Sequence, residues 1–256
     1  MTKVSIITVT YNSEKTILDT LISVSNQTHQ NIEHLIIDGC SNDRTLEIVE
    51  NFSSANLKII SEPDDGIYDA MNKGLDNASG DIVGFLNSDD MLNSEISIEH
   101  VVNAIKSGAQ ACYSDLVYVD QNDDNIIRYW KSGHFKTGKF AEGWAPPHPT
   151  FYIKTNVLSS YRFELSYSIS ADVVLMSCLM ELKKINTVYI PKVLVRMRIG
   201  GASNANLKSV ILQNMEVLES FKNNNIKYNL ITFVLNKLSN RLWQFILAYG
   251  KNKKFK

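Results

Sequence analysis

Two adjacent carboxylates, Asp89 and Asp90, stand just after a short apolar run at residues 82–86. An apolar run of this length, bounded by turn residues, predicts a buried strand of a parallel sheet. Carboxylates at the carboxyl end of such a strand can bind Mg²⁺ or Mn²⁺, ions that usually also contact substrate phosphates. The alternative is a turn that caps a helix, because Asn87, Ser88 and the aspartates all favour that position. The two interpretations, a metal site and a helix cap, can be distinguished only by considering the neighbouring strands and helices.

The first 90 residues alternate between apolar runs and helical patterns. Strands are expected at residues 4–9, 33–37, 57–60 and 82–86. A helix is expected after each of the first three strands: the first is capped by Ser13, the second is capped by residues 41–43, and the third covers residues 69–78. This alternation predicts an α/β fold with βαβ units and a parallel sheet whose strands end at one edge. That edge would gather residues 8–12, Asp38, residues 62–65 and residues 87–90. The convergence of four polar strand ends favours a functional site.

Composition narrows the class of protein. With 256 residues and 44% hydrophobic side chains, the chain can bury the core of one large domain or two small ones. Residues 1–219 carry a net charge of −9, which argues against nucleic acid as a partner. The three cysteines lack metal-binding spacing and fit a reducing compartment. The apolar run at residues 4–9 is too short for a secretion signal, so a cytoplasmic location is expected.

Four ordered motifs carry a resemblance to a known family. They are TVTYN at residues 8–12, IDG at residues 37–39, SEPDDGIYDAMNKG at residues 61–74 and NSDD at residues 87–90. Together they resemble family 2 glycosyltransferases, and weaker similarity continues to about residue 205. The resemblance implies the A-type glycosyltransferase fold, with a Rossmann-like nucleotide-binding sheet flanked by helices. Cys40 and Arg44 stand where the family has glycines, so the turn would differ if either glycine needed a positive φ.

The resemblance also implies an activity, namely inverting transfer of one sugar from a nucleotide-diphospho-sugar in bacterial O-antigen, capsule or exopolysaccharide synthesis. It implies that Asp38 accepts a hydrogen bond from uracil, which makes UDP the expected nucleotide; a turn aspartate before Gly39 is the alternative. It assigns the Mn²⁺ or Mg²⁺ ion to Asp90 and the donor ribose or sugar to Asp89. Lys73 would offset diphosphate charge, unless it is a solvated residue at a helix end. The further donor-side candidates, for some of which plain packing is the alternative, are Thr8, Thr10, Tyr11, Asn12, Asp64, Asp69, Asn87, Ser88 and Arg198.

The second half is expected to bind the acceptor. Residues 112–119 and 126–130 predict a hairpin. The resemblance makes Asp172 the catalytic base, whereas the residues alone also allow it to be the N-cap of the helix at residues 173–182. His148, held by two preceding prolines, resembles a site-facing histidine, with a structural histidine as the alternative; Trp144 is the other acceptor-side candidate. Residues 196–204 resemble a loop that closes over the donor, and a plain surface loop is the alternative.

A catalytic domain is expected at residues 1–219, with a nucleotide-sugar half at residues 1–95 and an acceptor half at residues 96–219. The remaining residues, 220–256, form a tail that differs from this domain in its charge. After Glu219 the chain has eight Lys and Arg and no acid. Apolar residues recur at helical spacing from Leu230, which predicts an amphipathic helix that binds an anionic membrane surface or packs on the sheet. The first reading makes the protein peripheral on the inner face of the membrane, with a saccharide acceptor that is lipid-linked. The Q-x-x-R-W signature of processive synthases is absent, which favours transfer of a single sugar.

Two other functions remain as alternatives. A nucleotidyltransferase that makes sugar nucleotides would share the sheet and the metal, but it needs a glycine-rich phosphate loop, and residues 8–15 contain no glycine. A non-catalytic carbohydrate-binding or scaffold protein could keep the fold after losing Asp90 or Asp172, and both are present.

Overall fold

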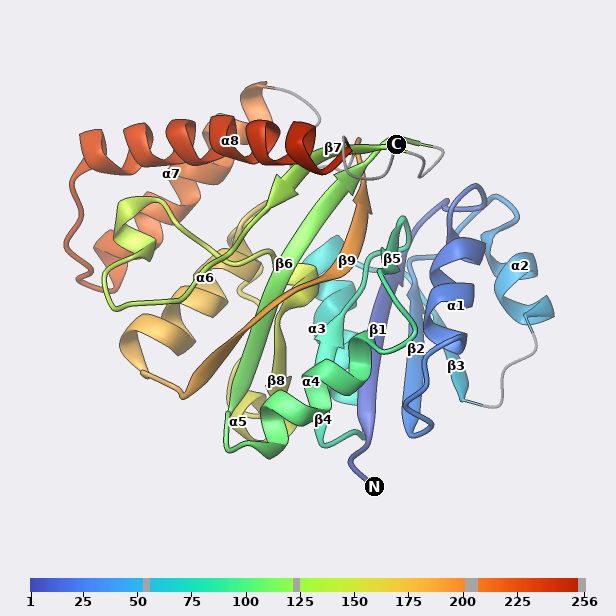
Figure 1. The fold of residues 1–256 in the computed structure, drawn as a ribbon. Helices are drawn as coiled ribbons and strands as arrows, with labels where there is room; N and C mark the ends of the chain where they lie inside the picture. Colours follow the sequence, from blue (N-terminus) through green and yellow to red (C-terminus); the bar gives the residue numbers. More distant parts are fainter. Residues whose placement is uncertain (53–55, 122–124, 201–206, 253–256) are drawn as a thin grey trace.

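The computed structural model describes residues 1–52, 56–121, 125–200 and 207–252 (Figure 1). The strands are β1 (Val4–Thr10), β2 (Ile32–Asp38), β3 (Leu57–Ser61), β4 (Ile82–Phe85), β5 (Asp90–Leu92), β6 (Ala111–Val119), β7 (Ile126–Trp130), β8 (Tyr152–Lys154) and β9 (Thr187–Arg198). The helices are α1 (Ile17–Ser25), α2 (Thr45–Asn51), α3 (Ile67–Asn77), α4 (Ser97–Lys106), α5 (Thr155–Leu158), α6 (Ala171–Ser177), α7 (Leu207–Asn223) and α8 (Leu230–Asn252). Three short turns of helix are η1 (Phe140–Glu142), η2 (His148–Thr150) and η3 (Cys178–Leu182).

All strands of the described residues join one sheet, in the order β3-β2-β1-β4-β8-β6-β9-β5, with β7 paired to β6. The four strands β1 to β4 are parallel, and their register aligns Thr10 with Asp38 and Asp38 with Ser61. The carboxyl ends of these strands therefore share one edge. The α/β fold with a Rossmann-like sheet, predicted from the alternation of strands and helices, is confirmed.

Helices cover both faces of the sheet, because strands β1, β2 and β4 are apolar on both sides. Helices α1 and α2 pack on one face through Ile17, Leu21 and Val49, and α4 covers the same face further along. Helices α3 and α6 pack on the other face, so that in Figure 1 α4 lies in front of the sheet and α3 behind it. Gly74 lets α3 approach β1, since a Cβ at this position would lie 2.4 Å from Ile7 Cγ2.

Antiparallel strands extend the sheet beyond β4. Strand β8 pairs with β4 and β6, and the predicted hairpin of residues 112–119 and 126–130 is confirmed as β6 and β7. Its turn at residues 122–124 lies outside the described residues. Asp90 begins β5, which pairs with the end of β9 so that Asp90 lies opposite Met197. This pairing fixes Asp90 within the sheet.

Some predicted boundaries are wrong. Ser13 does not cap α1, which begins at Ile17 after Thr16; instead the Ser13 hydroxyl lies 2.8 Å from that of Ser88. The helix expected at residues 69–78 already begins at Ile67. The predicted tail helix exists as α8, while the proposed boundary at residue 219 falls inside α7. The division into a catalytic domain and a tail stays a prediction.

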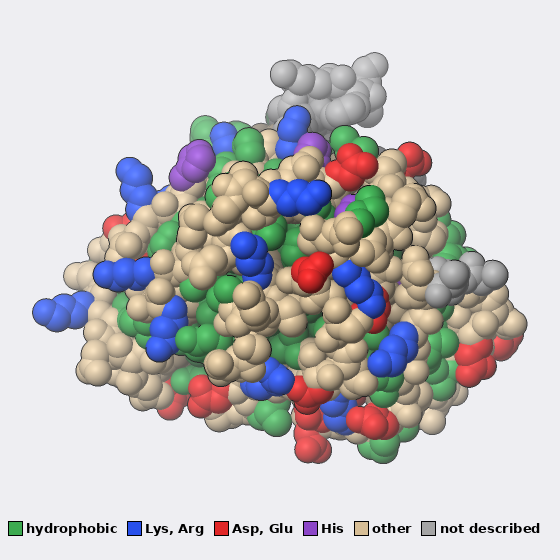
Figure 2. Space-filling model, turned by 90° about the horizontal axis from the view of Figure 1, so that it is seen from below, with side chains coloured by type: hydrophobic (Ala, Val, Ile, Leu, Met, Phe, Trp, Pro, Cys, Tyr) green, Lys and Arg blue, Asp and Glu red, His purple; other side chains and the backbone are tan. Residues whose placement is uncertain are grey.

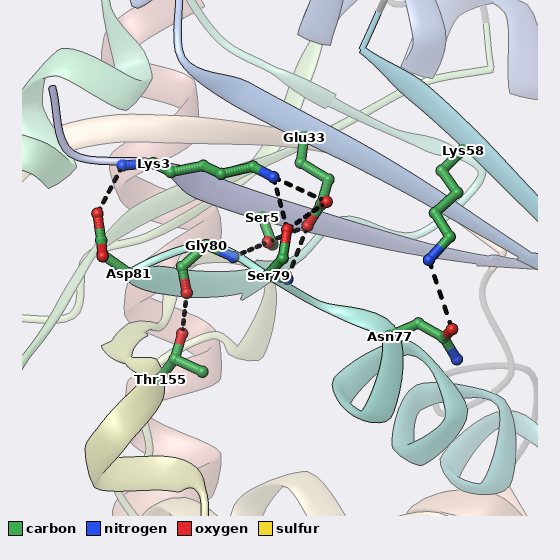
Figure 3. A network of polar contacts seen from close by, with 9 residues as sticks. All are labelled: Lys3, Ser5, Glu33, Lys58, Asn77, Ser79, Gly80, Asp81 and Thr155. Carbon is green, nitrogen blue, oxygen red and sulfur yellow. Dashed lines mark hydrogen bonds and ion pairs between the residues drawn. The ribbon is translucent and has the colours of Figure 1, made fainter.

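A polar network ties together the opposite edge, where strands β1, β2 and β4 begin (Figure 3). The Glu33 carboxylate accepts hydrogen bonds from Ser5 Oγ (2.6 Å), from the backbone N–H and hydroxyl of Ser79, and from Lys3 Nζ (3.0 Å). Burial raises the pKa of Glu33, but these donors outweigh it and lower the pKa to about 2. Figure 2, the view from below, shows basic and acidic side chains intermixed over this face.

Candidate active site

Asp38 ends β2 with its side chain fully buried. Its carboxylate accepts hydrogen bonds from the backbone N–H (3.0 Å) and hydroxyl of Ser41 and from Ser61 Oγ (2.7 Å). A carboxylate offers about four acceptor positions, so about one remains for a ligand. One acceptor position of the Asp38 carboxylate therefore has no donor among the described residues.

The end of β1 places its candidates in different surroundings. Thr8 is buried and lies 2.9 Å from His34 Nε2, and burial lowers the pKa of His34 to about 3, so this imidazole is neutral. Thr10 is also buried, and its Oγ1 has no hydrogen-bond partner among the described residues. Tyr11 is 60% exposed. Asn12, with φ of +51°, accepts a hydrogen bond from the Asn42 N–H (2.8 Å).

The turn after Asp38 keeps a left-handed residue although it lacks the family's glycine. Cys40 adopts a φ of +60°, a region that few non-glycine residues occupy. Arg44 has a φ of −80°, so its position makes no such demand. Gly39 is needed for close approach, since a Cβ there would lie 2.4 Å from Asp64 Oδ2. The loop after β3 is joined to the end of β2 by a hydrogen bond from the Glu62 N–H to the Asp38 carbonyl (3.0 Å).

Lys73 of α3 is paired with residues of the loop that precedes this helix and with Asp69 of the helix itself. Its Nζ forms ion pairs with Asp69 (3.2 Å) and Glu62 (3.3 Å) and donates to the Pro63 carbonyl. Burial lowers the pKa of Lys73, but the hydrogen bonds and charges of Asp69 and Glu62 raise it overall. Lys73 and Asp69 therefore lie at the predicted edge as a pair, and a diphosphate would have to compete for the lysine.

Asp90 is fully buried, and one of its oxygens is unsatisfied. Asn87 Nδ2 donates to Asp90 Oδ2 at 2.8 Å, whereas Oδ1 has no hydrogen-bond partner within the described chain. Burial and the neighbouring charge of Asp89 raise the pKa of Asp90 well above its ordinary value. Arg198, at the end of the adjacent strand, forms an ion pair with Asp19, while its Nε and Nη1 also lack partners. The two side chains leave opposite charges incompletely satisfied in one buried region.

This arrangement fits a divalent cation shared with a ligand. No group of three His, Cys, Asp or Glu that could hold a metal occurs in the described ranges. Mg²⁺ is typically bound by one or two carboxylates together with substrate phosphates and water. The unsatisfied Asp90 Oδ1 is a hard oxygen of the kind that such an ion prefers. Asp90 is thus suited to be the protein ligand of such an ion.

Asp172 is the second residue of α6, and the alternative that it caps the helix is wrong. The residue at the N-cap is Ser170, and the helix has no side-chain cap. The Tyr68 phenol donates to Asp172 Oδ1 at 2.9 Å, while Oδ2 has no hydrogen-bond partner among the described residues. The loop before Asp172 is held by Glu216 of α7, which accepts hydrogen bonds from the backbone and hydroxyls of Ser168 and Ser170. One carboxylate oxygen is therefore fixed and the other is available.

Two aromatic candidates lie nearby. His148 stacks on Phe85 with a ring-centre distance of 5.1 Å and meets Phe163 edge-on at 5.7 Å. Burial lowers the pKa of His148, although the charge of Asp172 opposes this shift. Trp144 Nε1 donates to the Ser132 carbonyl (2.7 Å) and packs against other aromatic rings. Both side chains are held in place by packing.

A cleft of about 660 Å³ connects these acceptor-side residues. It is lined by four predicted residues, Asn87, Trp144, His148 and Asp172, and by Tyr68. Its far wall comes from α7 and α8. The remaining predicted residues do not line this cleft; they lie around the strand ends described above. Asn87 joins the two regions, since it lines the cleft and donates to Asp90.

Helix α8 contributes both polar and apolar side chains to the cleft and leaves a second, apolar face exposed. Lys237, Asn240, Arg241 and Gln244 line the cleft. On its other side lie Ile231, Leu235, Leu242 and Ile246, each at least 55% exposed, here called the outer face of α8. Across the described parts of the chain, none of the helices has the length and apolarity that crossing a bilayer requires. The tail helix therefore both packs on the domain and leaves an apolar surface exposed.

The parallel strands β1 to β4, with polar side chains at their shared carboxyl edge, define an α/β protein with a Rossmann-like sheet. The family model of Glycosyl transferase family 2 matches residues 5–169. The chain belongs to this family, which confirms the resemblance seen in its motifs.

Curated relatives are similar over part of their length. The chain is 40% identical over 90 residues to the putative teichuronic acid biosynthesis glycosyltransferase TuaG of Bacillus subtilis, covering 34% of this chain and 36% of TuaG. It is 37% identical over 119 residues to a PGL/p-HBAD biosynthesis glycosyltransferase of Mycobacterium bovis, covering 45% of each. The matches thus span less than half the length of these relatives.

Solved structures show the same fold. The structure of S. aureus TarS 1–349 in complex with UDP-GlcNAc superimposes with a TM-score of 0.64 at 20% identity, covering 86% of this chain and 66% of that one. The mannosyltransferase PcManGT from Pyrobaculum calidifontis, in complex with GDP-Man and Mn²⁺, superimposes with a TM-score of 0.63 at 18% identity, covering 97% and 73%. The A-type fold expected from the motifs is confirmed.

Two residues of the site were not singled out from the sequence. Tyr68 lies within the motif at residues 61–74, but a tyrosine at the start of a helix is usually interpreted as a core residue. Glu216 lies in α7, where nothing in the local sequence shows that its carboxylate binds the loop at residues 168–170. Only their contacts with the Asp172 region reveal these positions.

Proposed function

We propose that the chain is an inverting glycosyltransferase that moves one sugar from a nucleotide-diphospho-sugar, with UDP as the nucleotide, to a saccharide acceptor. One observation carries this proposal: Asp172 faces the cleft with a free Oδ2, and Asn87 of the Asp89–Asp90 motif lines the same cleft. A base for the acceptor and a binding motif for the donor would then meet at one place.

The proposed reaction is a single displacement. Asp172 Oδ2 takes the proton of the acceptor hydroxyl, whose oxygen forms a bond to the anomeric carbon. The bond from that carbon to the diphosphate oxygen breaks on the opposite side, and UDP leaves with the electron pair. A divalent cation bound at Asp90, when present, supplies Lewis-acid stabilisation of the departing diphosphate. Because attack and departure take place on opposite faces, the anomeric configuration inverts.

The donor assignment is supported by the open position on Asp38 and by the fold. Asp38 can accept one further hydrogen bond, which suits the N3–H of uracil. TarS binds UDP-GlcNAc and PcManGT binds GDP-Man with Mn²⁺, so this fold carries different nucleotide sugars. We propose UDP for this chain on the basis of Asp38, with Arg198 and Asp89 close to the sugar or diphosphate.

The outer face of α8 supports a peripheral membrane location. Four large apolar residues exposed on one helix face, in a segment with eight basic residues and no acid, suit the interface of an anionic bilayer. TuaG is named for teichuronic acid biosynthesis, a surface polymer. We propose that the chain acts at the cytoplasmic face of the membrane on a lipid-linked acceptor.

A nucleotide-sugar panel tests the proposed function. The full chain is incubated with UDP-, GDP- and TDP-sugars in the presence of Mn²⁺. Slow hydrolysis is measured by identifying the phosphate-containing product. Release of UDP supports the proposal. In a separate incubation with UTP and a sugar 1-phosphate, release of pyrophosphate with formation of the UDP-sugar would indicate a nucleotidyltransferase. Absence of both turnover and metal-dependent nucleotide binding would indicate a non-catalytic protein.

A further inference from the structure

The cleft beside Asp172 is basic in a protein that is otherwise acidic. Its lining includes five basic residues, Arg128, Lys131, Lys139, Lys237 and Arg241, against the two carboxylates Glu142 and Asp172. Residues 1–219 as a whole carry a net charge of −9. The positive charge of the cleft is therefore a local feature.

Arg128 is the most buried of these cations. On β7 its side chain is 8% exposed, with its guanidinium carbon 3.8 Å from the ring centre of Tyr118 and 5.4 Å from that of Trp130. Its Nε has no hydrogen-bond partner within the described chain. Burial lowers the pKa of Arg128, and the charge of Arg241 adds to this effect. Leaving a donor of a buried cation unsatisfied is costly unless a ligand completes it.

Helix α8 brings two more cations to the same wall. Burial and the charge of Arg241 lower the pKa of Lys237 to about 8, although Asp172 opposes the shift. Lys237 Nζ donates to Asn214 Oδ1, and Arg241 is exposed and lines the cleft. The charge of Arg241 thus acts unfavourably on both Arg128 of β7 and Lys237 of α8. A bound anion would relieve this repulsion.

We infer that the wall formed by Arg128, Lys237 and Arg241 is a subsite for an anionic group of the acceptor, a phosphate or a carboxylate. The inference rests on the proposed function, because it names the class of acceptor that Asp172 would deprotonate. The fork of an arginine matches the two oxygens of either anion. The three cations line the same cleft as Asp172 and Asn87. Neutral saccharides would then be poor acceptors.

Ligand titration of the full chain tests this subsite. Inorganic phosphate, methyl β-glucuronide and methyl β-glucoside are titrated, with and without saturating UDP and Mg²⁺, and binding is followed by NMR. We expect at least one of the two anions to bind about tenfold or more tightly than the glucoside. The preference between phosphate and glucuronide identifies the source of the anion. Equal binding of all three probes in the unmodified protein would overturn the inference.

Three variants localise the subsite. Arg128→Gln and Arg241→Gln are expected to lose most of the anion preference, while Lys106→Gln, a matched charge change on exposed α4, keeps it. Because Arg241 is exposed, its variant should fold even if Arg128→Gln does not, and retention of the full preference in Arg241→Gln would contradict the inference. A fall in UDP affinity with an unchanged anion preference would place these cations at the donor instead. If UDP fails to bind while the anion preference persists, the proposed function fails and the subsite stands.

Discussion

The Tyr68 phenol donates a hydrogen bond of 2.9 Å to Asp172 Oδ1, joining α3 to α6 across 104 positions of sequence. This contact fixes one carboxylate oxygen of Asp172, which lines the cleft, and leaves the other without a hydrogen-bond partner among the described residues. Tyr68→Phe should lower kcat for donor hydrolysis by about tenfold, since a hydrogen bond to a charged group is worth roughly 1.5 kcal/mol or more. UDP affinity, measured by calorimetry, should stay unchanged. Tyr161→Phe removes a hydroxyl without a hydrogen bond in the described chain and serves as the control; equal kcat in the two variants would refute a positioning role.

Asp90→Asn should abolish the gain in UDP affinity that Mn²⁺ provides, because an amide oxygen is a much weaker ligand than a carboxylate. In the metal-free protein the same change should increase the free energy of unfolding. The raised pKa of Asp90 means that its ionised form destabilises the fold at neutral pH, and the amide removes that charge. Calorimetry with Mn²⁺ or with chelator, and urea unfolding, measure the two effects. Glu50→Gln, a carboxylate-to-amide change at an exposed site of α2, is the control; a full metal-dependent gain in Asp90→Asn would exclude Asp90 as the ligand.

The sequence predicted those parts of the fold that depend on short-range pattern. Strands β1, β2 and β4 are apolar runs with turn residues after them, so both their existence and their parallel pairing could be inferred. The pairing of Asp90 with Met197 on β9 could not, because a three-residue strand such as β5 has no pattern of its own. The ion pair between Arg198 and Asp19 likewise joins residues 179 positions apart.

The cleft shows the same division between local and long-range information. Asp172 could be chosen as a candidate from its motif. That it does not cap the helix became clear only from the structure of α6, whose N-cap residue is Ser170. That α8 forms a wall of the cleft depends on its packing against β7, which amphipathic spacing leaves open. The donor and metal roles of the predicted residues remain predictions.

Stability should depend on pH through Glu33 at the far edge of the sheet. Its pKa is lowered from 4.5 to about 2, so its contribution is complete above the unfolded pKa and disappears as pH falls from about 5 to about 2. The linkage amounts to about 3 kcal/mol at neutral pH, of which about 2 kcal/mol is lost by pH 3. Glu33→Gln should therefore show a flatter fall in the free energy of unfolding between pH 6 and pH 3. A slope equal to that of the unmodified protein would contradict the assignment.

Membrane binding should depend on the outer face of α8. The double change Leu235→Glu/Leu242→Glu should reduce sedimentation with anionic vesicles by about tenfold or more, since each buried leucine contributes about 1.5 kcal/mol or more. The pair Gln30→Glu/Asn103→Glu adds the same charge at exposed sites elsewhere and should reduce binding much less. If both pairs bind vesicles equally, the outer face of α8 is not the membrane contact.

The most direct test of the account is the turnover of Asp172→Asn. The variant keeps the shape of the side chain, and because Asp172 is not a cap, the change should leave α6 intact. With the nucleotide sugar that the panel identifies as donor, and with water replacing the acceptor, kcat for release of UDP should fall about 100-fold or more. UDP affinity should remain that of the unmodified protein. Turnover close to normal with intact UDP binding would contradict the central claim that Asp172 is the base.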